Sequence, residues 1–328
     1  MRDVPDGRVQ MGERSMPDRL RAALEAACAR PVEPELAEPF ALTLPATVAA
    51  PLIFSSPHSG RVYPQRFLDA AKIDLVTLRR SEDAFVDRLF ARAAQGAPML
   101  SALFPRAYLD LNREPYELDP RMFAEPLPDF ANGKSLRVAA GLGTVPRVVA
   151  DAREIYREKM SVEEALRRVE SLYKPYHAAL NALVDEALGD FGVAVLIDCH
   201  SMPTISARDP GQGPRAEKRR VDFVIGDRFG VSCDRRLADA LEQALRGFGY
   251  NVHRNRPYAG GFITEHHGRP AARRHAIQIE VARGLYMDEA TLTPNDRFEE
   301  VAERLNAAIG EVARVLPLVG APTRLAAE

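Results

Sequence analysis

Two histidines of this chain, His58 and His200, follow short apolar runs directly. Residues 193–197 form an unbroken apolar run that leads into Asp198 and His200, and residues 52–54 lead into a small-residue turn that carries His58. Such runs predict strands buried on both faces of an α/β sheet. Because ligands bind beyond the carboxyl ends of strands in open α/β sheets, both histidines are predicted to face a site. The alternative is that they only bond to neighbouring backbone, as many buried polar groups do.

An acidic pair, Glu82 and Asp83, offers the carboxylate that two imidazoles need to form a metal site. Two histidines, one carboxylate and an open position for water are the ligand set of catalytic zinc hydrolases. Zinc is therefore the expected ion, bound as a single divalent cation. The ligands come from distant segments, without the compact H-E-x-x-H pattern of a helix site. From the residues alone either acid could be the third ligand, and a solvated helix surface is the alternative for both.

Glu280 interrupts the apolar alternation of a predicted strand at residues 275–281. An acid in the middle of such a strand is costly unless it is paired or functional. Near a metal it could take a proton from the attacking water and pass it to a leaving nitrogen, which makes it the candidate general base. A structural ion pair with Arg283 is the alternative.

Asn112 and Arg113 follow a predicted strand at residues 107–111. The guanidinium fork suits bidentate capture of a substrate carboxylate, and the amide beside it adds a donor. An ion pair with a neighbouring acid is the alternative. A dicarboxylic substrate would need a second cation, for which the sequence offers three candidates, Arg106, Arg269 and Arg283.

A glycine-containing segment at residues 257–268 is predicted to be a loop. It carries the adjacent pair His266 and His267, and Arg269 follows it. The loop could belong to the site or could simply be exposed. We take His266 and Arg269 as candidate substrate-binding residues.

The elements that must position these side chains alternate between strands and helices, which predicts an α/β fold. The clearest helix is at residues 161–188, where Ser161 and Glu164 form a capping box and Pro175 is expected to break the helix. Further strands are predicted at residues 99–103, 107–111, 221–225, 250–256 and 275–281, and further helices at residues 16–30, 65–95, 232–248 and 296–316.

The predicted core of the chain is a single domain at residues 42–316. Five prolines between residues 31 and 51 exclude a helix there and indicate an extended lead-in, so residues 1–41 are expected to be a loosely attached appendage. Residues 115–146 are rich in Pro, Gly and Asp with little periodicity, which is typical of a lid or binding loop. Residues 317–328 are expected to be a flexible tail.

Composition limits the class of protein. The 44 Lys and Arg nearly cancel the 46 Asp and Glu, leaving a formal charge of -2, so no nucleic-acid surface is indicated and a small molecule is the expected partner. Three scattered cysteines fit neither a disulfide framework nor a paired-cysteine metal site. No apolar run is long enough to span a membrane, and the charged N-terminus lacks a signal-peptide pattern. A cytoplasmic location is expected, and the sequence gives no oligomeric state.

Several segments, taken in one order, make the chain resemble the N-formylglutamate amidohydrolase family. The resemblance covers nearly everything from Leu52 to Asp288. The segments are residues 57–60 (PHSG), 83–87 (DAFVD), 111–113 (LNR), 173–177 (YKPYH), 198–201 (DCHS), 257–261 (PYAGG), 278–281 (QIEV) and 285–288 (LYMD). Jointly they are specific.

The resemblance implies a three-layer α/β/α fold with a mixed, largely parallel sheet, similar to that of zinc carboxypeptidases and acylamino-acid deacylases. It implies a metal at His58, Asp83 and His200, with Glu280 as the base and Arg113 as the carboxylate-binding residue. Asp83 is favoured over Glu82 because the family resemblance falls on that position, although 25 positions (83 minus 58) separate it from His58, unlike the short motif of carboxypeptidases.

The same resemblance implies hydrolysis of an N-acyl amino acid, with N-formyl-L-glutamate, an intermediate of histidine breakdown, as the first candidate. Two other classes stay open from the residues. A non-catalytic module could bind an amino acid or peptide terminus in the same pocket, and a phosphoesterase could use His and Asp clusters with two metals. Metal stoichiometry and product release distinguish the three.

Overall fold

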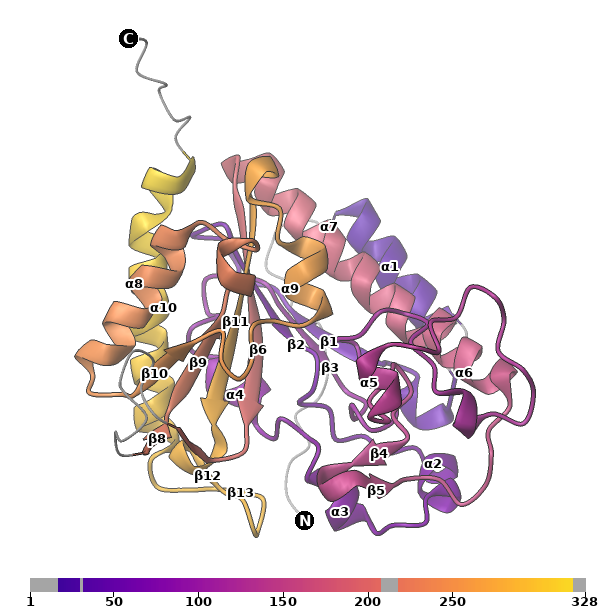
Figure 1. Ribbon diagram of the computed structural model, residues 1–328. Helices are drawn as coiled ribbons and strands as arrows, with labels where there is room; N and C mark the ends of the chain where they lie inside the picture. The colour runs from indigo at the N-terminus through magenta and orange to yellow at the C-terminus, as the bar shows by residue number, and fades with distance from the viewer. Residues whose placement is uncertain (1–16, 30–31, 208–217, 321–328) are drawn as a thin grey trace.

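The computed structural model describes residues 17–29, 32–207 and 218–320. Its centre is a seven-stranded sheet in which β2, β3, β6 and β11 run parallel, and β9 and β10 run parallel to each other (Figure 1). The antiparallel pairs are β1 with β3 and β11 with β9. In sheet order the strands are β1 (Phe40–Thr43), β3 (Met99–Ala102), β2 (Leu52–Ser56), β6 (Ala194–Met202), β11 (Arg274–Ala282), β9 (Phe223–Gly226) and β10 (Val252–Arg254). The predicted α/β fold with a mixed, largely parallel sheet is confirmed.

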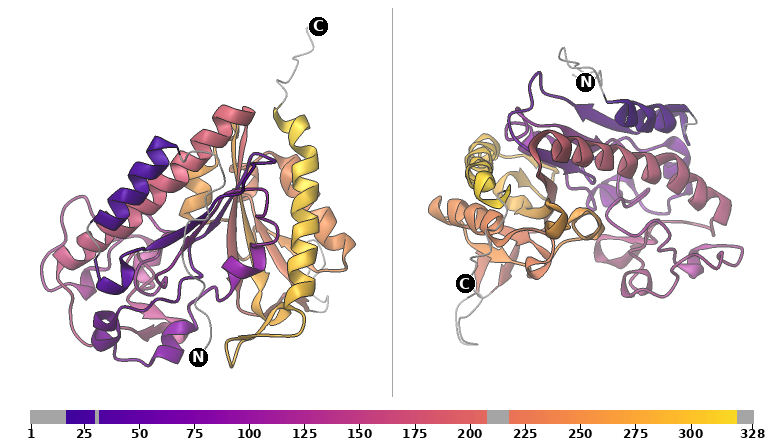
Figure 2. Two further views of the ribbon diagram at one scale, coloured as in Figure 1. Left: turned by 180° about the vertical axis from the view of Figure 1, so that it is seen from behind. Right: turned by 90° about the horizontal axis from the view of Figure 1, so that it is seen from above.

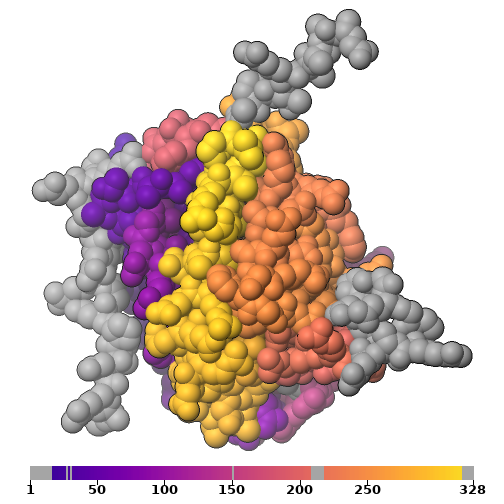
Figure 3. Space-filling model, turned by 90° about the vertical axis from the view of Figure 1, so that its left-hand side faces the viewer, coloured from indigo at the N-terminus to yellow at the C-terminus, as the bar shows by residue number. Residues whose placement is uncertain are grey.

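Helices cover both faces of the sheet, which gives three layers (Figure 2). One face carries α4 (Val86–Phe90), α8 (Arg235–Gly247) and α10 (Phe298–Gly320), and Figure 3 shows α10 and α8 side by side on the surface. The other face carries α1 (Asp18–Ala29) and α7 (Lys174–Phe191). The alternating side chains of β11 divide between the two cores as its sequence pattern predicts.

Small elements complete the chain. Two-stranded ribbons are formed by β4 (Val148–Val149) with β5 (Arg153–Glu154), β7 (Ile205–Ala207) with β8 (Arg219–Val221), and β12 (Met287–Asp288) with β13 (Thr293–Pro294). Short 3-10 turns lie at Pro34–Leu36, Pro120–Met122, Ala150–Ala152, Arg228–Gly230, Pro270–Ala272 and Arg283–Leu285. Among the described helices, none combines the length and apolar character that crossing a bilayer requires.

The predicted continuous helix at residues 65–95 is wrong. The segment forms three short helices, α2 (Gln65–Ala70), α3 (Leu75–Arg79) and α4, separated by turns. The Asp74 side chain caps α3 by accepting from the Thr77 N–H, and Phe85 adopts a left-handed φ of 64° that prevents the helix from continuing. Leu75, the first residue of α3, is 43% exposed.

Two further segments differ from their predicted structure. Residues 107–111 form no strand, because the N–H groups of Tyr108 and Leu109 fold back onto the Pro105 carbonyl in a turn. The predicted loop at residues 257–268 ends in a helix, α9 (Phe262–His267). Both changes alter where the side chains that follow them point.

The predicted helix at residues 161–188 is present but interrupted. The Ser161 hydroxyl accepts from the Glu164 N–H and caps α6 (Val162–Arg168), as expected. A π-helical turn, η4 (Val169–Tyr173), then joins α6 to α7. Pro175 lacks an N–H group and so cannot supply the regular hydrogen bond, which accounts for the break just before it.

The N-terminal helix is packed rather than loosely attached. Leu20 of α1 is fully buried in the same core as Phe40 and Leu42, and α1 lies along α7. The expected boundary at residue 42 therefore falls inside β1. At the other end α10 continues through Pro317 to Gly320, so the predicted tail is helical over its first residues. Its remainder and the predicted irregular start lie outside the described residues.

Candidate metal centre and substrate pocket

The three metal ligands favoured by the sequence meet at one point beyond the sheet. His58 follows β2, Asp83 lies in the turn between α3 and α4, and His200 is on β6. One ligand atom from each lies within 4.8 Å of the others, and all three side chains are buried. This triad is the only such group among the described residues.

The inner atoms of the triad are both Nδ1 nitrogens and one carboxylate oxygen. Asp83 Oδ2 lies 3.3 Å from His58 Nδ1 and 3.0 Å from His200 Nδ1. The outer nitrogens face other acids: His58 Nε2 is 2.7 Å from Asp110 Oδ1, and His200 Nε2 is 3.0 Å from Asp198 Oδ2. Carboxylates behind ligating imidazoles fix the ring orientation and hold the proton on the outer nitrogen.

The donor set fits a divalent cation. With the Nε2 proton directed at Asp110, His58 Nδ1 carries a lone pair, is buried and has no hydrogen-bond partner. A lone pair facing a carboxylate oxygen is unfavourable unless a positive charge lies between them. The surrounding acids favour positive charge here: burial lowers the pKa of His200, but Asp198 and Asp83 outweigh it and hold that pKa well above its usual value.

Glu82, the alternative ligand, points elsewhere. Its carboxylate accepts a hydrogen bond of 2.8 Å from the Tyr63 hydroxyl and pairs with Arg79. The turn after α3 thus separates two consecutive acids, and the structure brings Asp83 rather than Glu82 to the imidazoles.

Glu280 lies beside the triad on β11, directly opposite His200 in the strand register. Burial, with a smaller contribution from the negative charge of Asp83, raises the pKa of Glu280 to about 8 against the opposing effect of His200. The Gln278 amide donates to Glu280 Oε1 at 2.8 Å. Arg283, considered above as its ion-pair partner, instead bonds Asp83 Oδ1 at 3.2 Å and the Ser201 hydroxyl. The carboxyl group therefore keeps one oxygen for another partner.

Arg113 is held in place by main-chain carbonyls. Its Nε donates to Leu142 O at 2.9 Å and its Nη1 to Asn112 O at 2.8 Å, while Nη2 lies 3.6 Å from Asp110 Oδ2. Only Nη2 is left without a hydrogen bond of its own. The guanidinium is thus oriented before any substrate arrives.

Asn112 is already committed within the protein. Its Oδ1 accepts from Ile263 N at 2.8 Å, and its Nδ2 donates to Asp198 Oδ2 at 3.5 Å, beside the His200 ring. Gly261 packs against it so closely that a Cβ there would come within 2.4 Å of the amide. Asn112 therefore connects α9 to the triad and shapes the site from behind, rather than offering free donors to a substrate.

The helices α6 and α7, with the π-helical turn between them, hold the segment at residues 108–113 in place. Across the π-helical turn, Arg168 Nη1 donates to Tyr108 O at 3.1 Å, the Tyr173 hydroxyl to Arg113 O at 2.7 Å and His177 Nε2 to Leu111 O at 2.9 Å. Two of these hydrogen bonds come from ring side chains near Pro175, Tyr173 and His177, which explains why rings cluster there in the sequence. They support the site from outside it.

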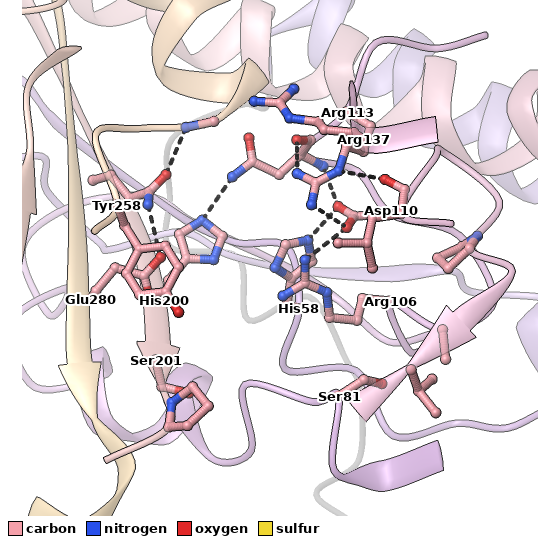
Figure 4. A pocket seen from close by; sticks show the side chains of 18 of the residues that line it. His58, Ser81, Arg106, Asp110, Arg113, Arg137, His200, Ser201, Tyr258 and Glu280 are labelled. Carbon is pink, nitrogen blue, oxygen red and sulfur yellow. Dashed lines mark hydrogen bonds and ion pairs between the residues drawn. The ribbon is translucent and has the colours of Figure 1, made fainter. Parts of the chain in front are cut away.

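A pocket of about 640 Å³ opens in front of the triad (Figure 4). The region at residues 115–146, predicted to be a lid or binding loop, contributes Arg137 and Leu142 to its wall. The sequence-based prediction gave no site role to the following pocket residues, although the last two stand in segments that carry the family resemblance: Arg80, Asp110, Arg137, Tyr258 and Gln278. Asp110 could have been considered from the sequence, because it stands only two residues before the candidate site residue Asn112.

His266 and Arg269 do not line this pocket. Because residues 262–267 are helical, the His266 ring stacks on Phe262, with centroids 5.2 Å apart, next to His267. Arg269 pairs through its backbone with Arg274. Their assignment as substrate-binding residues therefore has no support in the geometry, whereas Gly260 and Gly261 of the same segment do reach the pocket.

Comparison with known proteins decides the family. The model of the N-formylglutamate amidohydrolase family matches residues 50–287. The chain belongs to this family. The family predicted from sequence is confirmed, and with it the prediction of a hydrolase that acts on an amide.

Individual proteins of this family match the chain over most of their length. An N-formylglutamate deformylase of Pseudomonas aeruginosa is 32% identical over 271 residues, covering 81% of this chain and 92% of the relative. That of Pseudomonas putida is 31% identical over 279 residues, covering 83% and 94%. The crystal structure of an N-formylglutamate amidohydrolase from Ralstonia eutropha JMP134 is 37% identical with a TM-score of 0.76, covering 85% of this chain and 99% of that one.

Proposed function

We propose that this amidohydrolase converts N-formyl-L-glutamate and water into formate and L-glutamate. The names of its relatives support the substrate, and the buried triad supports a metal-dependent reaction. We assign the ion to His58, Asp83 and His200, and expect Zn²⁺ because two imidazoles and one carboxylate suit it. A role in histidine breakdown and a cytoplasmic location remain predictions.

When bound, the ion would polarise the formyl carbonyl and lower the pKa of the attacking water. The residues around it have separate tasks. Asp110 and Asp198 keep the Nε2 protons of the two imidazoles outside, so that both Nδ1 lone pairs point inward. Arg283 and Arg106 lie against Asp83 and Asp110 and compensate the buried negative charge.

Glu280 is the proposed general base. Water adds to the formyl carbon while its proton passes to Glu280, and the C–N bond then breaks as Glu280 delivers this proton to the departing nitrogen. A carboxyl with a raised pKa suits both steps, because it holds the proton strongly enough to carry it and releases it to an amine. Its position opposite His200 keeps it next to the reacting atoms.

Arg113 is the proposed partner of the substrate α-carboxylate. Its carbonyl contacts to Leu142 and Asn112 fix the guanidinium, so binding costs little side-chain entropy. Holding the carboxylate would place the formyl amide over the triad and reduce the entropic barrier.

The observation that carries the proposal is the buried, unpartnered Nδ1 of His58 facing Asp83. We expect chelator treatment to abolish formate release from N-formyl-L-glutamate, and one equivalent of Zn²⁺ to restore it. His200→Ala should lose both bound metal and turnover, whereas His266→Ala, outside the pocket, should keep both. Metal content by elemental analysis and formate release are the measurements.

Three outcomes would contradict the proposal. Turnover that survives metal removal would refute the role of the ion. Two ions per chain with activity on phosphate esters would indicate a phosphoesterase, and substrate binding without product would indicate a binding module.

A further inference from the structure

The arginines that line the pocket differ in what already neutralises them. Arg106 Nη2 lies 2.8 Å from Asp110 Oδ2, and Arg283 Nη2 lies 3.2 Å from Asp83 Oδ1. Both guanidiniums are therefore paired with acids of the metal centre. The sequence offered three candidates for a second substrate-binding cation. Arg106 and Arg283 are already paired with protein acids, and the third, Arg269, does not line the pocket.

Arg137 is differently placed. It belongs to α5 (Leu136–Ala139) within the region at residues 115–146, and its side chain is 38% exposed. Its ion-pair partner among the described residues is Glu117, at 3.8 Å, a distance at which the pair is loose. Figure 4 shows Arg137 and Arg113 close together on one side of the pocket, across from Ser81 and Ser201.

Two guanidiniums side by side repel each other unless an anion lies between or beside them. Burial lowers the pKa of Arg113, and the positive charges of Arg106 and Arg137 lower it further, against the effect of Asp110. With Nε and Nη1 of Arg113 already bonded to carbonyls, one fork cannot hold two carboxylates. The pair as a whole has more positive charge than its protein partners neutralise.

The backbone that carries Arg137 is held in position. The Ser135 hydroxyl caps α5 by accepting from Val138 N at 3.1 Å, and Val138 is buried beneath it. Arg121 Nη2 donates to Ala139 O at 3.0 Å at the end of the same turn. These contacts present the Arg137 side chain to the pocket from an ordered element.

We propose that Arg137 binds the second carboxylate of a dicarboxylic amino-acid substrate, beside Arg113, and so sets the preference for an acidic side chain. This inference rests on the proposed function, which needs an amino-acid carboxylate at Arg113. The two carboxylates of a glutamate moiety are joined by a short carbon chain, so neighbouring guanidiniums can engage both. Arg80 also lines the pocket; its neighbour in the sequence, Ser81, lies across from Arg113 in Figure 4.

The deciding test is ligand binding by calorimetry, on the metal-loaded protein, with glutarate and butyrate as probes. Arg137→Gln should weaken glutarate binding about 10- to 100-fold, the range for a lost charge-assisted contact, and leave butyrate binding unchanged. Lys134→Gln removes an exposed positive charge from the same region outside the pocket and should change neither. Arg137→Lys, which keeps the charge, should retain part of the preference for glutarate.

Kinetics give a second readout. In Arg137→Gln the kcat/KM ratio for N-formyl-L-glutamate over N-formyl-L-glutamine should fall by a similar factor. Unchanged glutarate affinity in Arg137→Gln, or the same loss in Arg80→Gln instead, would overturn the inference. If the wild-type protein binds glutarate through Arg137 but does not hydrolyse N-formyl-L-glutamate, the proposed function fails while this inference stands.

Discussion

The two sides of the pocket are built in different ways. On one side, His200 and Glu280 are set opposite each other by the paired backbones of β6 and β11. On the other side, Arg113 lies in a turn and Arg137 in the single-turn helix α5, and these segments are held by individual hydrogen bonds to carbonyls and caps. The proposed catalytic residues are thus positioned by the sheet, and we call this part of the pocket the sheet side. The proposed substrate-binding residues are positioned by turns and short elements outside the sheet, and we call this part the irregular side. Changes on the first side should alter kcat, and changes on the second should alter KM.

The largest expected effect is on the sheet side. Glu280→Gln keeps the shape of the side chain but cannot accept the proton, so kcat should fall about 10²- to 10⁴-fold with little change in KM or metal content. Glu303→Gln, which alters an exposed acid of α10, is the matched control. Ordinary kcat in Glu280→Gln would refute the assignment of the base.

The pH profile of the wild-type enzyme sharpens the same prediction. A general base must be unprotonated, and burial raises the pKa of Glu280 to about 8. Turnover should therefore fall about tenfold per pH unit as pH drops below that pKa. A nearby cation lowers a carboxyl pKa, so this limb should lie below pH 8 in the metal-loaded enzyme. Glu280→Gln should lack the limb.

A smaller effect is expected on the irregular side. Arg113→Ala removes the proposed charge-assisted contact to the substrate, so KM should rise about 10- to 100-fold while metal content stays the same. Arg92→Ala, at an exposed ion pair with Glu303, is the control. Equal KM in variant and parent would remove the proposed role of Arg113, and loss of metal would show that the two sides are not separable.

The smallest effect tests the support behind Arg113. Tyr173→Phe deletes the hydroxyl that donates to Arg113 O at 2.7 Å, so KM should rise about two- to tenfold with kcat nearly unchanged. Tyr250→Phe, whose hydroxyl contacts Arg304 of α10, is the control. A fall in kcat at constant KM would break the distinction between the two sides.

The sheet side could be read from the sequence because its signals are local. The apolar runs before His58 and His200 predicted strands, and the alternation around Glu280 predicted the face on which it lies. Consecutive strand ends in a parallel sheet meet at one edge, so distance along the chain did not matter. Choosing Asp83 over Glu82 needed the family resemblance, because the turn that carries them is fixed by a contact between distant residues, the Asp83 N–H donating to His58 O at 3.0 Å.

The irregular side could not be read in this way. Asp110 was assigned to a strand that does not form, and nothing in the spacing of Arg137 marks it as a pocket residue. Their positions depend on contacts between residues far apart in the sequence, such as His58 with Asp110 and Arg113 with Leu142. Such contacts produce no periodic pattern in the sequence. His266 was misplaced for the opposite reason, since a glycine-rich loop was expected where a helix turns its ring away.

The π-helical turn η4 has a consequence for the whole irregular side. Its i→i+5 hydrogen bonding brings residues five apart onto one face, so Arg168 and Tyr173 align, and His177 follows one regular turn later. In an uninterrupted α-helix each residue advances by about 100°, so deleting a single residue here would swing Arg168 away from Tyr108. The alignment of the proposed substrate contacts therefore depends on the length of one helical turn, a property that no single substitution in the pocket would reveal.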